Sequence, residues 1–223
     1  MNMILADACA EVMRDFTVEA ADTPALIAET FRLRHQVYCV EHHFLPGDDG
    51  LETDGFDSHS VHAVLRHRAS GDVIGSARLV MAERDNADAC FPVQAVCSMS
   101  LHPHVAVGRT AEVSRIAISK ERLKAIQRPP SLLRMALFRG VAMLSAQHSL
   151  THWCAVMEPV LLRLLRGNGI HFAPLGGLVD YHGERQPCHA SITQLFSRLR
   201  RESPEIWSFI TSEGLFADVS MAA

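Results

Sequence analysis

The sequence predicts a single domain with a mixed α/β fold, and three observations lead to this prediction. Apolar residues recur at strand and helix spacing in the order strand, helix, hairpin, strand, helix, strand, helix, strand. The 223 residues, 48% of them hydrophobic, suit one large domain or two small ones. The chain has neither a Gly-x-Gly-x-x-Gly turn after the first strand nor a Walker sequence, which argues against a doubly wound dinucleotide or P-loop fold.

The first two expected elements are a short strand and a helix. Residues 16–20 alternate in polarity, which is typical of a strand. Residues 24–40 carry apolar side chains mostly three or four positions apart, which predicts a helix. Asp22 or Thr23 is suited to cap this helix, and Pro24 is suited to its first position.

A loop and a hairpin follow. Residues 44–57 are rich in Pro, Gly and Asp, which form turns. Two apolar runs, residues 61–65 and 73–80, flank the turn sequence of residues 69–72, and together they predict a β-hairpin. Residues 83–107 show no regular pattern.

The apolar run at residues 111–119 holds two ionisable groups. Its density of Ile, Val and Ala predicts a buried strand, where a charge is costly unless it is paired or used. In a regular strand Glu112 and Ser114 share one face, and Arg115 points the other way. Either the strand bulges here, or each charge has its own partner. A structural salt bridge at the strand end is the alternative to a functional site.

The second half of the chain alternates helices and strands. A stop at residues 128–131 precedes an expected helix at 132–148, and residues 151–157 predict a central strand. Residues 160–166 predict a short helix that ends at a glycine-rich cap. The last expected elements are strands at residues 170–179 and 186–192 and a helical tail from about 195 to 210.

The composition excludes several classes of function. A net charge of −4 does not indicate a general nucleic-acid binder, and no apolar run approaches the length of about 18 residues that a membrane span needs. The first fifteen residues lack the pattern of a signal peptide, so we expect a cytoplasmic protein. Six scattered cysteines indicate reduced thiols, and no histidine or cysteine spacing predicts a metal site.

Three polar clusters accompany the strand that carries Glu112. Each one alone is compatible with solvated charges or with an ion pair at a strand edge. They are Arg34-His35-Gln36-Val37-Tyr38 with Glu41 and Phe44 after it, Glu52-Thr53-Asp54-Gly55-Phe56-Asp57, and Gly75-Ser76-Ala77-Arg78.

In this order, and followed by Glu112-x-Ser114-Arg115, the clusters resemble those of the acyl-homoserine lactone synthases and the long-chain N-acyl amino acid synthases. The stretch of residues 31–46 looks most like the acyltransferases associated with the PEP-CTERM/exosortase system. The resemblance implies a GNAT-like fold, in which a mostly antiparallel central sheet is flanked by helices. It also implies transfer of a medium- or long-chain acyl group from a thioester to an amine.

The residues suit that chemistry. Glu112 is the expected base for the attacking amine, and backbone N–H groups near Arg115 are expected to bind the oxyanion. Arg34, Arg78 and Arg115 are candidates for an acceptor carboxylate, and Arg34 and Arg115 join Glu112 as the expected catalytic residues. Asp54 and Asp57 either hold the ammonium group or order the loop. The other expected substrate-binding residues are Tyr38, Phe44, Ser114, Ile116, Ala117, Ile118, Trp153 and Met157.

The segment after the Glu112 strand bears on the acyl donor. Residues 119–130 contain no glycine, whereas enzymes that use acetyl-CoA usually bind pyrophosphate there on a glycine-rich turn. We therefore expect the acyl-phosphopantetheine of acyl carrier protein as the donor rather than CoA, and no permanently bound cofactor. Lys120, Arg122, Lys124 and Arg128 are the expected docking patch for this acidic partner, with an ordinary solvated face as the alternative.

Two other functions stay open. The first is an acyl-homoserine lactone (autoinducer) synthase that uses S-adenosylmethionine, although His42-His43-Phe44 stands where those enzymes tend to have Leu-Gly-Trp. The second is a non-catalytic module that binds acyl carriers. An N-acyl amino acid synthase-like enzyme is the function that the residues favour.

Overall fold

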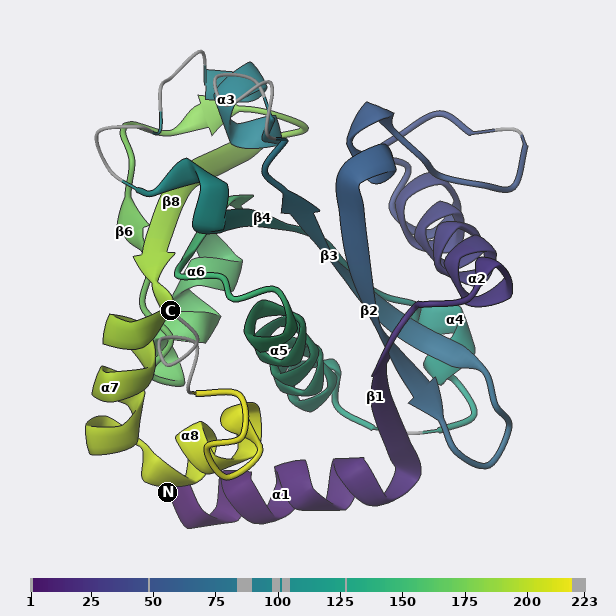
Figure 1. Cartoon of the computed structure of the whole chain (residues 1–223). Helices are drawn as coiled ribbons and strands as arrows, with labels where there is room; N and C mark the ends of the chain where they lie inside the picture. Colours follow the sequence, from purple (N-terminus) through teal and green to yellow (C-terminus); the bar gives the residue numbers. More distant parts are fainter. Residues whose placement is uncertain are drawn as a thin grey trace.

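The structure, a computed structural model, describes residues 2–47, 49–83, 90–97, 101, 105–126 and 128–217. Eight strands form a sheet in the order β1-β2-β3-β4-β5-β8-β6, with β7 beside β8 (Figure 1). The strands are β1 Phe16–Ala20, β2 Ser60–His67, β3 Val73–Met81, β4 Thr110–Ile118, β5 His152–Met157, β6 Ala173–Pro174, β7 Val179–Asp180 and β8 Glu184–Ser191. The helices are α1 Asn2–Asp15, α2 Pro24–His35, α3 Pro92–Cys97, α4 Lys120–Leu123, α5 Pro130–Gln147, α6 Pro159–Gly167, α7 Ile192–Glu202 and α8 Pro204–Thr211.

The sheet is mostly antiparallel, as expected for a GNAT-like fold. Among the described strands β4 and β5 pair in parallel, and every other neighbouring pair is antiparallel. The parallel pairing joins Thr110–Glu112 to His152–Cys154 and then stops, although β4 continues to Ile118 and β5 to Met157. The two central strands therefore separate beyond Glu112, and this separation leaves room for a cavity.

Different helices cover the two faces of the sheet. Ala63 and Leu65 of β2 point into the main core with α5, whereas Val64 between them packs with Leu33 of α2 on the opposite face. Helices α1 and α8 contact α5 and cover the side of it away from the sheet (Figure 1). Gly140 allows α5 to approach the sheet closely, because a Cβ there would lie 2.7 Å from Cβ of Ala63.

Several expected elements are confirmed within a few residues. They are the hairpin β2–β3, the strands β1, β4, β5 and β8, and the helix α5. The helix expected at 24–40 has a different end. Thr23 caps α2 and Pro24 begins it, but after His35 the chain continues as a π-helix, Gln36–Glu41. This wider turn at the end of a helix is typical of functional segments.

The structure differs from the sequence analysis at three other elements. Helix α1 was not expected, yet Val12 in it is fully buried. The segment without a pattern contains α3, which follows the fully buried Phe91. Residues 170–179 were expected to form a strand, but only Ala173–Pro174 and Val179 pair with β8, so burial of Ile170 rather than sheet pairing explains the apolar residues. Within the described residues, no helix is long and apolar enough to cross a membrane.

Candidate functional site

A β-bulge in β4 lies at the centre of the site. Ser76 of β3 is opposite Ala117, and Arg78 is opposite Ser114, so two residues of β4 face one residue of β3. Arg115 is one of the two, and its φ of 50° is in the left-handed region. The bulge confirms one of the two alternatives for this strand. Because the strand is not regular at this point, the extra residue brings the side chain of Arg115 to the face that carries Ser114.

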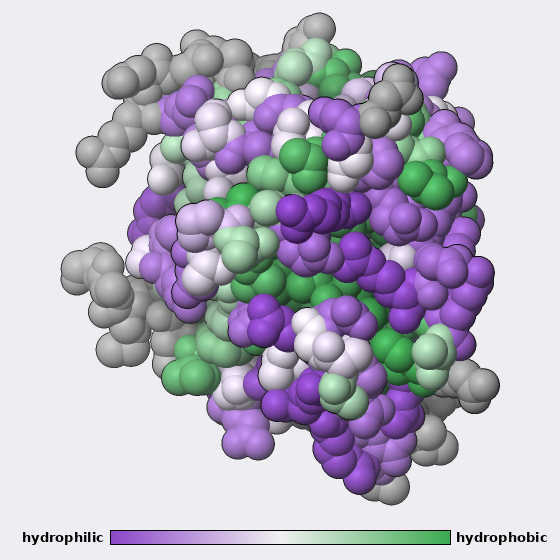
Figure 2. Space-filling view, turned by 90° about the vertical axis from the view of Figure 1, so that its right-hand side faces the viewer, coloured by the Kyte–Doolittle hydropathy of each residue, from purple (hydrophilic) through white to green (hydrophobic). Residues whose placement is uncertain are grey.

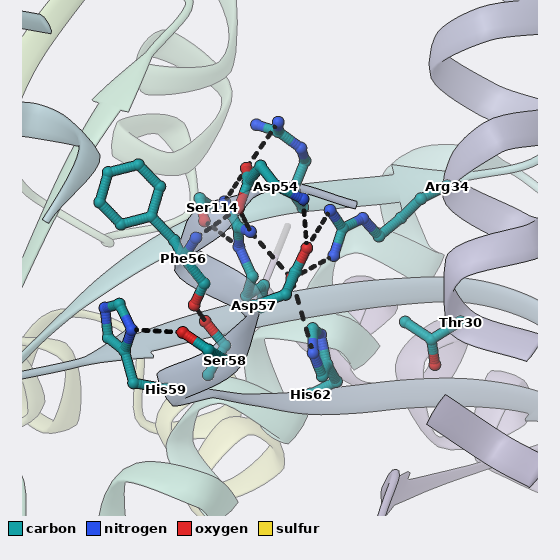
Figure 3. A network of polar contacts seen from close by, with 12 residues as sticks. Thr30, Arg34, Asp54, Phe56, Asp57, Ser58, His59, His62 and Ser114 are labelled. Carbon is teal, nitrogen blue, oxygen red and sulfur yellow. Dashed lines mark hydrogen bonds and ion pairs between the residues drawn. The ribbon is translucent and has the colours of Figure 1, made fainter. Parts of the chain in front are cut away.

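Three arginines and three carboxylates meet on that face. Arg34 Nη1 lies 2.6 Å from Asp57 Oδ1, and Arg78 Nη1 lies 2.6 Å from Asp54 Oδ1. Arg115 Nη2 lies 3.0 Å from both Glu52 Oε1 and Asp54 Oδ2. Further bonds join Arg34 to Glu52 and Arg78 to Asp57, and Arg78 Nε also donates to Ser114 Oγ. Figure 3 shows Arg34 reaching from α2 toward Asp57, with Asp54 and Ser114 beside it.

This network is largely buried. The side chains of Arg34 and Arg78 are 0% exposed, and that of Arg115 is 16% exposed. Burial favours the neutral form of Asp57, but the hydrogen bond and charge of Arg34, together with the charge of Arg78, hold its pKa well below the usual range. The pKa of Asp54 and that of Glu52 are also lowered by their arginine partners, against the effect of burial. The three carboxylates are therefore charged at neutral pH.

The network changes the roles expected for its members. Arg34 and Arg78 have no exposed surface and each serves two carboxylates, so binding an acceptor carboxylate would require breaking buried ion pairs. This geometry does not favour the expected acceptor-binding role for these two residues. Asp54 and Asp57 form a capping box at the start of a 3₁₀ helix, in which Asp57 Oδ2 accepts from the N–H of Asp54 at 2.8 Å. They order the loop, which was one of the two roles considered.

Glu52 was overlooked as a site residue. It stands in the quoted cluster but received no role, and its side chain, 5% exposed, bridges Arg34 and Arg115. The pattern Glu-x-Asp-x-x-Asp was the available signal, since three carboxylates and three arginines can neutralise one another only if Glu52 takes part.

Glu112 lies apart from this network. It is 1% exposed, and its Oε2 accepts a 2.7 Å hydrogen bond from the N–H of Val93. Burial raises the pKa of Glu112 to about 8, although the Val93 N–H and the charges of Arg78 and Arg115 oppose the shift. A carboxyl group with such a pKa accepts and releases protons near neutral pH.

Glu112 lines a cavity of about 500 Å³ between β4, β5 and α6. The polar part of its wall includes Ser114 and Arg115. The apolar part is formed mainly by Val37, Ile116, Ile118, Met157, Val160, Leu161 and Leu164. On the face of the molecule seen in Figure 2, hydrophobic surface lies in a hollow bordered by hydrophilic side chains.

Most of the expected substrate-binding residues line this cavity. Those that do are Tyr38, Phe44, Ser114, Arg115, Ile116, Ile118 and Met157. Burial raises the pKa of Tyr38 to about 12, and its OH donates to the carbonyl of Ile116 at 3.3 Å. Tyr38 therefore supports the wall of the cavity at the bulge.

Trp153 and Ala117 were expected at the cavity but do not line it. Trp153 is 1% exposed, and its Nε1 donates to Ser145 Oγ at 2.8 Å in the main core. Ala117 is also part of that core, at 1% exposure. The side chains of both residues pack in the core against α5 and do not reach the cavity.

Glu41 holds the turn between β4 and α4. Its Oε1 accepts from Ser119 Oγ at 2.6 Å, and its Oε2 accepts from the N–H of Lys120 at 2.9 Å. The N–H of Glu121 donates to the same carboxylate at 3.3 Å. Burial opposes the charge of Glu41, but these hydrogen bonds outweigh it and lower its pKa. An anion from the chain itself thus occupies the backbone donors of this turn.

The expected docking patch is partly neutralised. Arg122 Nη1 lies 2.6 Å from Glu29, and Arg128 Nη2 lies 2.5 Å from Asp15. Lys124, 72% exposed, pairs with Glu121 one helical turn away. Lys120 is exposed. Arg122 and Arg128 therefore connect segments of the chain, and a docking role for the four residues remains a prediction.

The sequence profile of the acetyltransferase (GNAT) domain matches residues 33–125, which carry the network, the bulge and Glu112. This part of the chain is a GNAT-type acyltransferase domain. Its reaction class is therefore acyl transfer, which confirms that expectation, and the mixed sheet confirms the expected GNAT-like fold.

Several solved structures share the fold of this GNAT domain. The AHL synthase LasI has a TM-score of 0.62 and 19% identity, covering 78% of this chain and 88% of LasI. BjaI, a CoA-dependent acyl-homoserine lactone synthase with SAM and isopentyl-CoA, has a TM-score of 0.60 and 21% identity over 85% of this chain and 89% of its own. FeeM, an N-acyl amino acid synthase from uncultured soil microbes, has a TM-score of 0.58 and 13% identity over 83% and 96%. No curated protein matches the sequence.

Proposed function

We propose that this GNAT domain transfers a medium- or long-chain acyl group from acyl carrier protein to the amine of an amino acid or a similar acceptor. The observation that carries the proposal is a buried carboxyl group, Glu112, in the wall of an otherwise largely apolar cavity. A proton acceptor at the closed end and an apolar slot along the wall are what amide formation from a long-chain thioester requires.

The reaction needs no covalent enzyme intermediate. The neutral amine nitrogen attacks the thioester carbon, the negative charge moves to the carbonyl oxygen, and the C–S bond then breaks. Glu112, as carboxylate, takes the proton that the amine loses and passes it to the departing thiolate, so one amide and one thiol are formed. Backbone N–H groups at the Arg115 bulge are suited to stabilise the oxyanion.

The acceptor site follows from the ion pairs. Among Arg34, Arg78 and Arg115, only Arg115 both lines the cavity and is partly exposed. It is held by Glu52 and Asp54 on one side and lies over the ring of Tyr38, with 5.6 Å between its Cζ and the ring centroid. An acceptor carboxylate is therefore expected at Arg115, while Arg34 and Arg78 fix the loop that holds it.

Glu41 supports carrier protein as the donor. A pyrophosphate group such as that of CoA needs free N–H groups at the turn after β4. Here the N–H groups of Lys120 and Glu121 already bond to the Glu41 carboxylate. A donor without the nucleotide end does not need these groups.

The direct test supplies palmitoyl-loaded carrier protein, palmitoyl-CoA and a panel of amino acids, with products identified by mass spectrometry. We expect an N-acyl amino acid and faster turnover with the carrier protein. If folded protein forms no amide with any amine, the proposal is wrong.

The second candidate is acyl-homoserine lactone synthesis, favoured by the shared fold with LasI and BjaI. Adding S-adenosylmethionine to the same assay decides between the two, because only this second function produces a lactone.

A further inference from the structure

Three arginines line the cavity, and they differ in their partners. Arg115 is paired with Glu52 and Asp54, and Arg185 lies 3.2 Å from Glu158. Arg134, in the second turn of α5, forms no ion pair with any carboxylate in the part of the chain that the structure describes. Its charge is thus available to a ligand in the cavity.

Arg134 belongs to the open end of the cavity. Burial lowers the pKa of His42, and the charges of Lys120 and Arg134 lower it further, so both cations lie near this imidazole. His42 stacks on Phe44 with 5.1 Å between ring centroids, and Phe44 is 40% exposed. Glu112, at 1% exposure, marks the closed end. The cavity therefore has a buried end suited to chemistry and an exposed end with unpaired positive charge.

Two carboxylates near His42 do not cancel this charge. Glu41 is bonded to Ser119 and to the N–H groups of Lys120 and Glu121. Glu158 pairs with Arg185. An anionic group that enters at this end meets side-chain cations, because the backbone donors of the turn are already used.

We propose that Arg134 binds the phosphate of the donor's phosphopantetheine arm. The inference rests on the proposed function, since it assumes a thioester donor whose acyl end reaches Glu112. A long pantetheine arm with its thioester at the closed end has its phosphate toward the open end, where Arg134 is the unpaired arginine. A guanidinium group suits a phosphate because it offers parallel N–H donors.

The test compares palmitoyl-phosphopantetheine with palmitoyl-pantetheine, which lacks the phosphate, on the wild-type protein and on Arg134→Gln. We expect wild type to prefer the phosphorylated donor by about tenfold or more in kcat/KM. In Arg134→Gln the preference should disappear through a higher KM for that donor, with little change for palmitoyl-pantetheine. Arg134→Lys should restore part of it. Arg163→Gln, an exposed arginine of α6 outside the cavity wall, is the matched control.

Two kinetic results would overturn the proposal. One is an equal loss with both donors, which indicates a structural role. The other is an Arg134→Gln variant that keeps the donor preference but no longer discriminates between an amino acid and its decarboxylated amine. That result would place the acceptor carboxylate at Arg134. Calorimetric binding of phosphopantetheine and pantetheine gives the same comparison without turnover. If binding shows the phosphate preference but no amide forms, the proposed function fails and the assignment of Arg134 stands.

Discussion

The backbone N–H of Val93 in α3 donates a 2.7 Å hydrogen bond to Oε2 of Glu112 on β4. This bond fixes one carboxyl oxygen of Glu112 inside the protein, so the group cannot turn toward water. Glu112 is buried without an ion pair, and this burial raises its pKa to about 8. Glu52 and Asp54 are paired with arginines, and their pKa values are lowered. Two kinds of carboxyl group thus adjoin one another, one suited to proton transfer and one to holding the structure.

Glu112→Gln should lower turnover by about 10²-fold or more, because the amide cannot accept a proton from the amine. In the wild type, kcat/KM should rise with pH and level off above about 8, as Glu112 ionises. The variant should lack this rise while binding the acyl donor normally. The measurement is a pH–rate profile with donor affinity determined in parallel, and an undiminished rate in the variant would exclude Glu112 as the base.

The same group predicts a pH dependence of stability. The pKa of Glu112 is about 8 in the folded protein and ordinarily 4.5, so the folded state binds the extra proton between these values. The contribution of this proton to the free energy of unfolding is fully present below pH 4.5 and is lost as pH rises through about 8. Between these values the free energy of unfolding falls by up to about 1.4 kcal/mol per pH unit.

Urea unfolding of wild type and Glu112→Gln from pH 5 to pH 9 measures this contribution. The stability of the variant relative to wild type should increase with pH, because Gln has no charge to bury. A constant difference across this range would contradict the raised pKa.

Arg78→Met should destabilise the protein by about 3–5 kcal/mol, because it leaves Asp54 and Asp57 buried without one of their partners. Arg66→Met is the matched control on the neighbouring strand. Its ion pair with Glu19 is about 40% exposed on both sides, so it should cost no more than about 1 kcal/mol. Urea unfolding at pH 7 compares the two variants. Equal losses would mean that the network contributes no more than a surface ion pair.

Leu161→Trp should shorten the acyl chain that the enzyme accepts. Leu161 lines the cavity from α6, and a larger ring there fills part of the apolar slot. We expect turnover with a 16-carbon donor to fall about tenfold or more, with little change for a 6-carbon donor. Arg166→Trp places the same ring on an exposed position of α6 and is the control. Equal effects on both donors would place the acyl chain elsewhere.

Local patterns account for the parts of the fold that were predicted. The hairpin β2–β3 and the strand β4 show apolar runs bounded by turns, and such signals lie within a few neighbouring residues. Thr23 and Pro24 predicted the start of α2 for the same reason. The end of α2 was not predicted. In the π-helix that follows it, Tyr38 bonds to a carbonyl 78 residues later in the chain, and a local pattern cannot show such a contact.

The candidate site was predicted in its members but not in their roles. Arg34, Asp57 and Arg78 were selected from the order of polar clusters, and the structure brings them together. Whether an arginine is free or saturated depends on which carboxylates surround it in space, and Arg34 receives both of its partners from a loop 18 to 23 residues away. Trp153 was assigned to the cavity because a strand pattern alone does not show which of its side chains reach the cavity.

The sequence by itself determined the mixed α/β class, the strand that carries Glu112 and Arg115, and the set of charged residues near it, because these depend on residue type and local spacing. Only the tertiary structure decided which charged groups are paired with one another. The bulge turned Arg115 to the face of Ser114, and Glu112 is buried without an ion pair. Glu41 accepts hydrogen bonds from the backbone N–H groups of the turn after β4. Each of these depends on atoms that are distant in the sequence and within about 3 Å in space, where electrostatic and hydrogen-bond energies are decided.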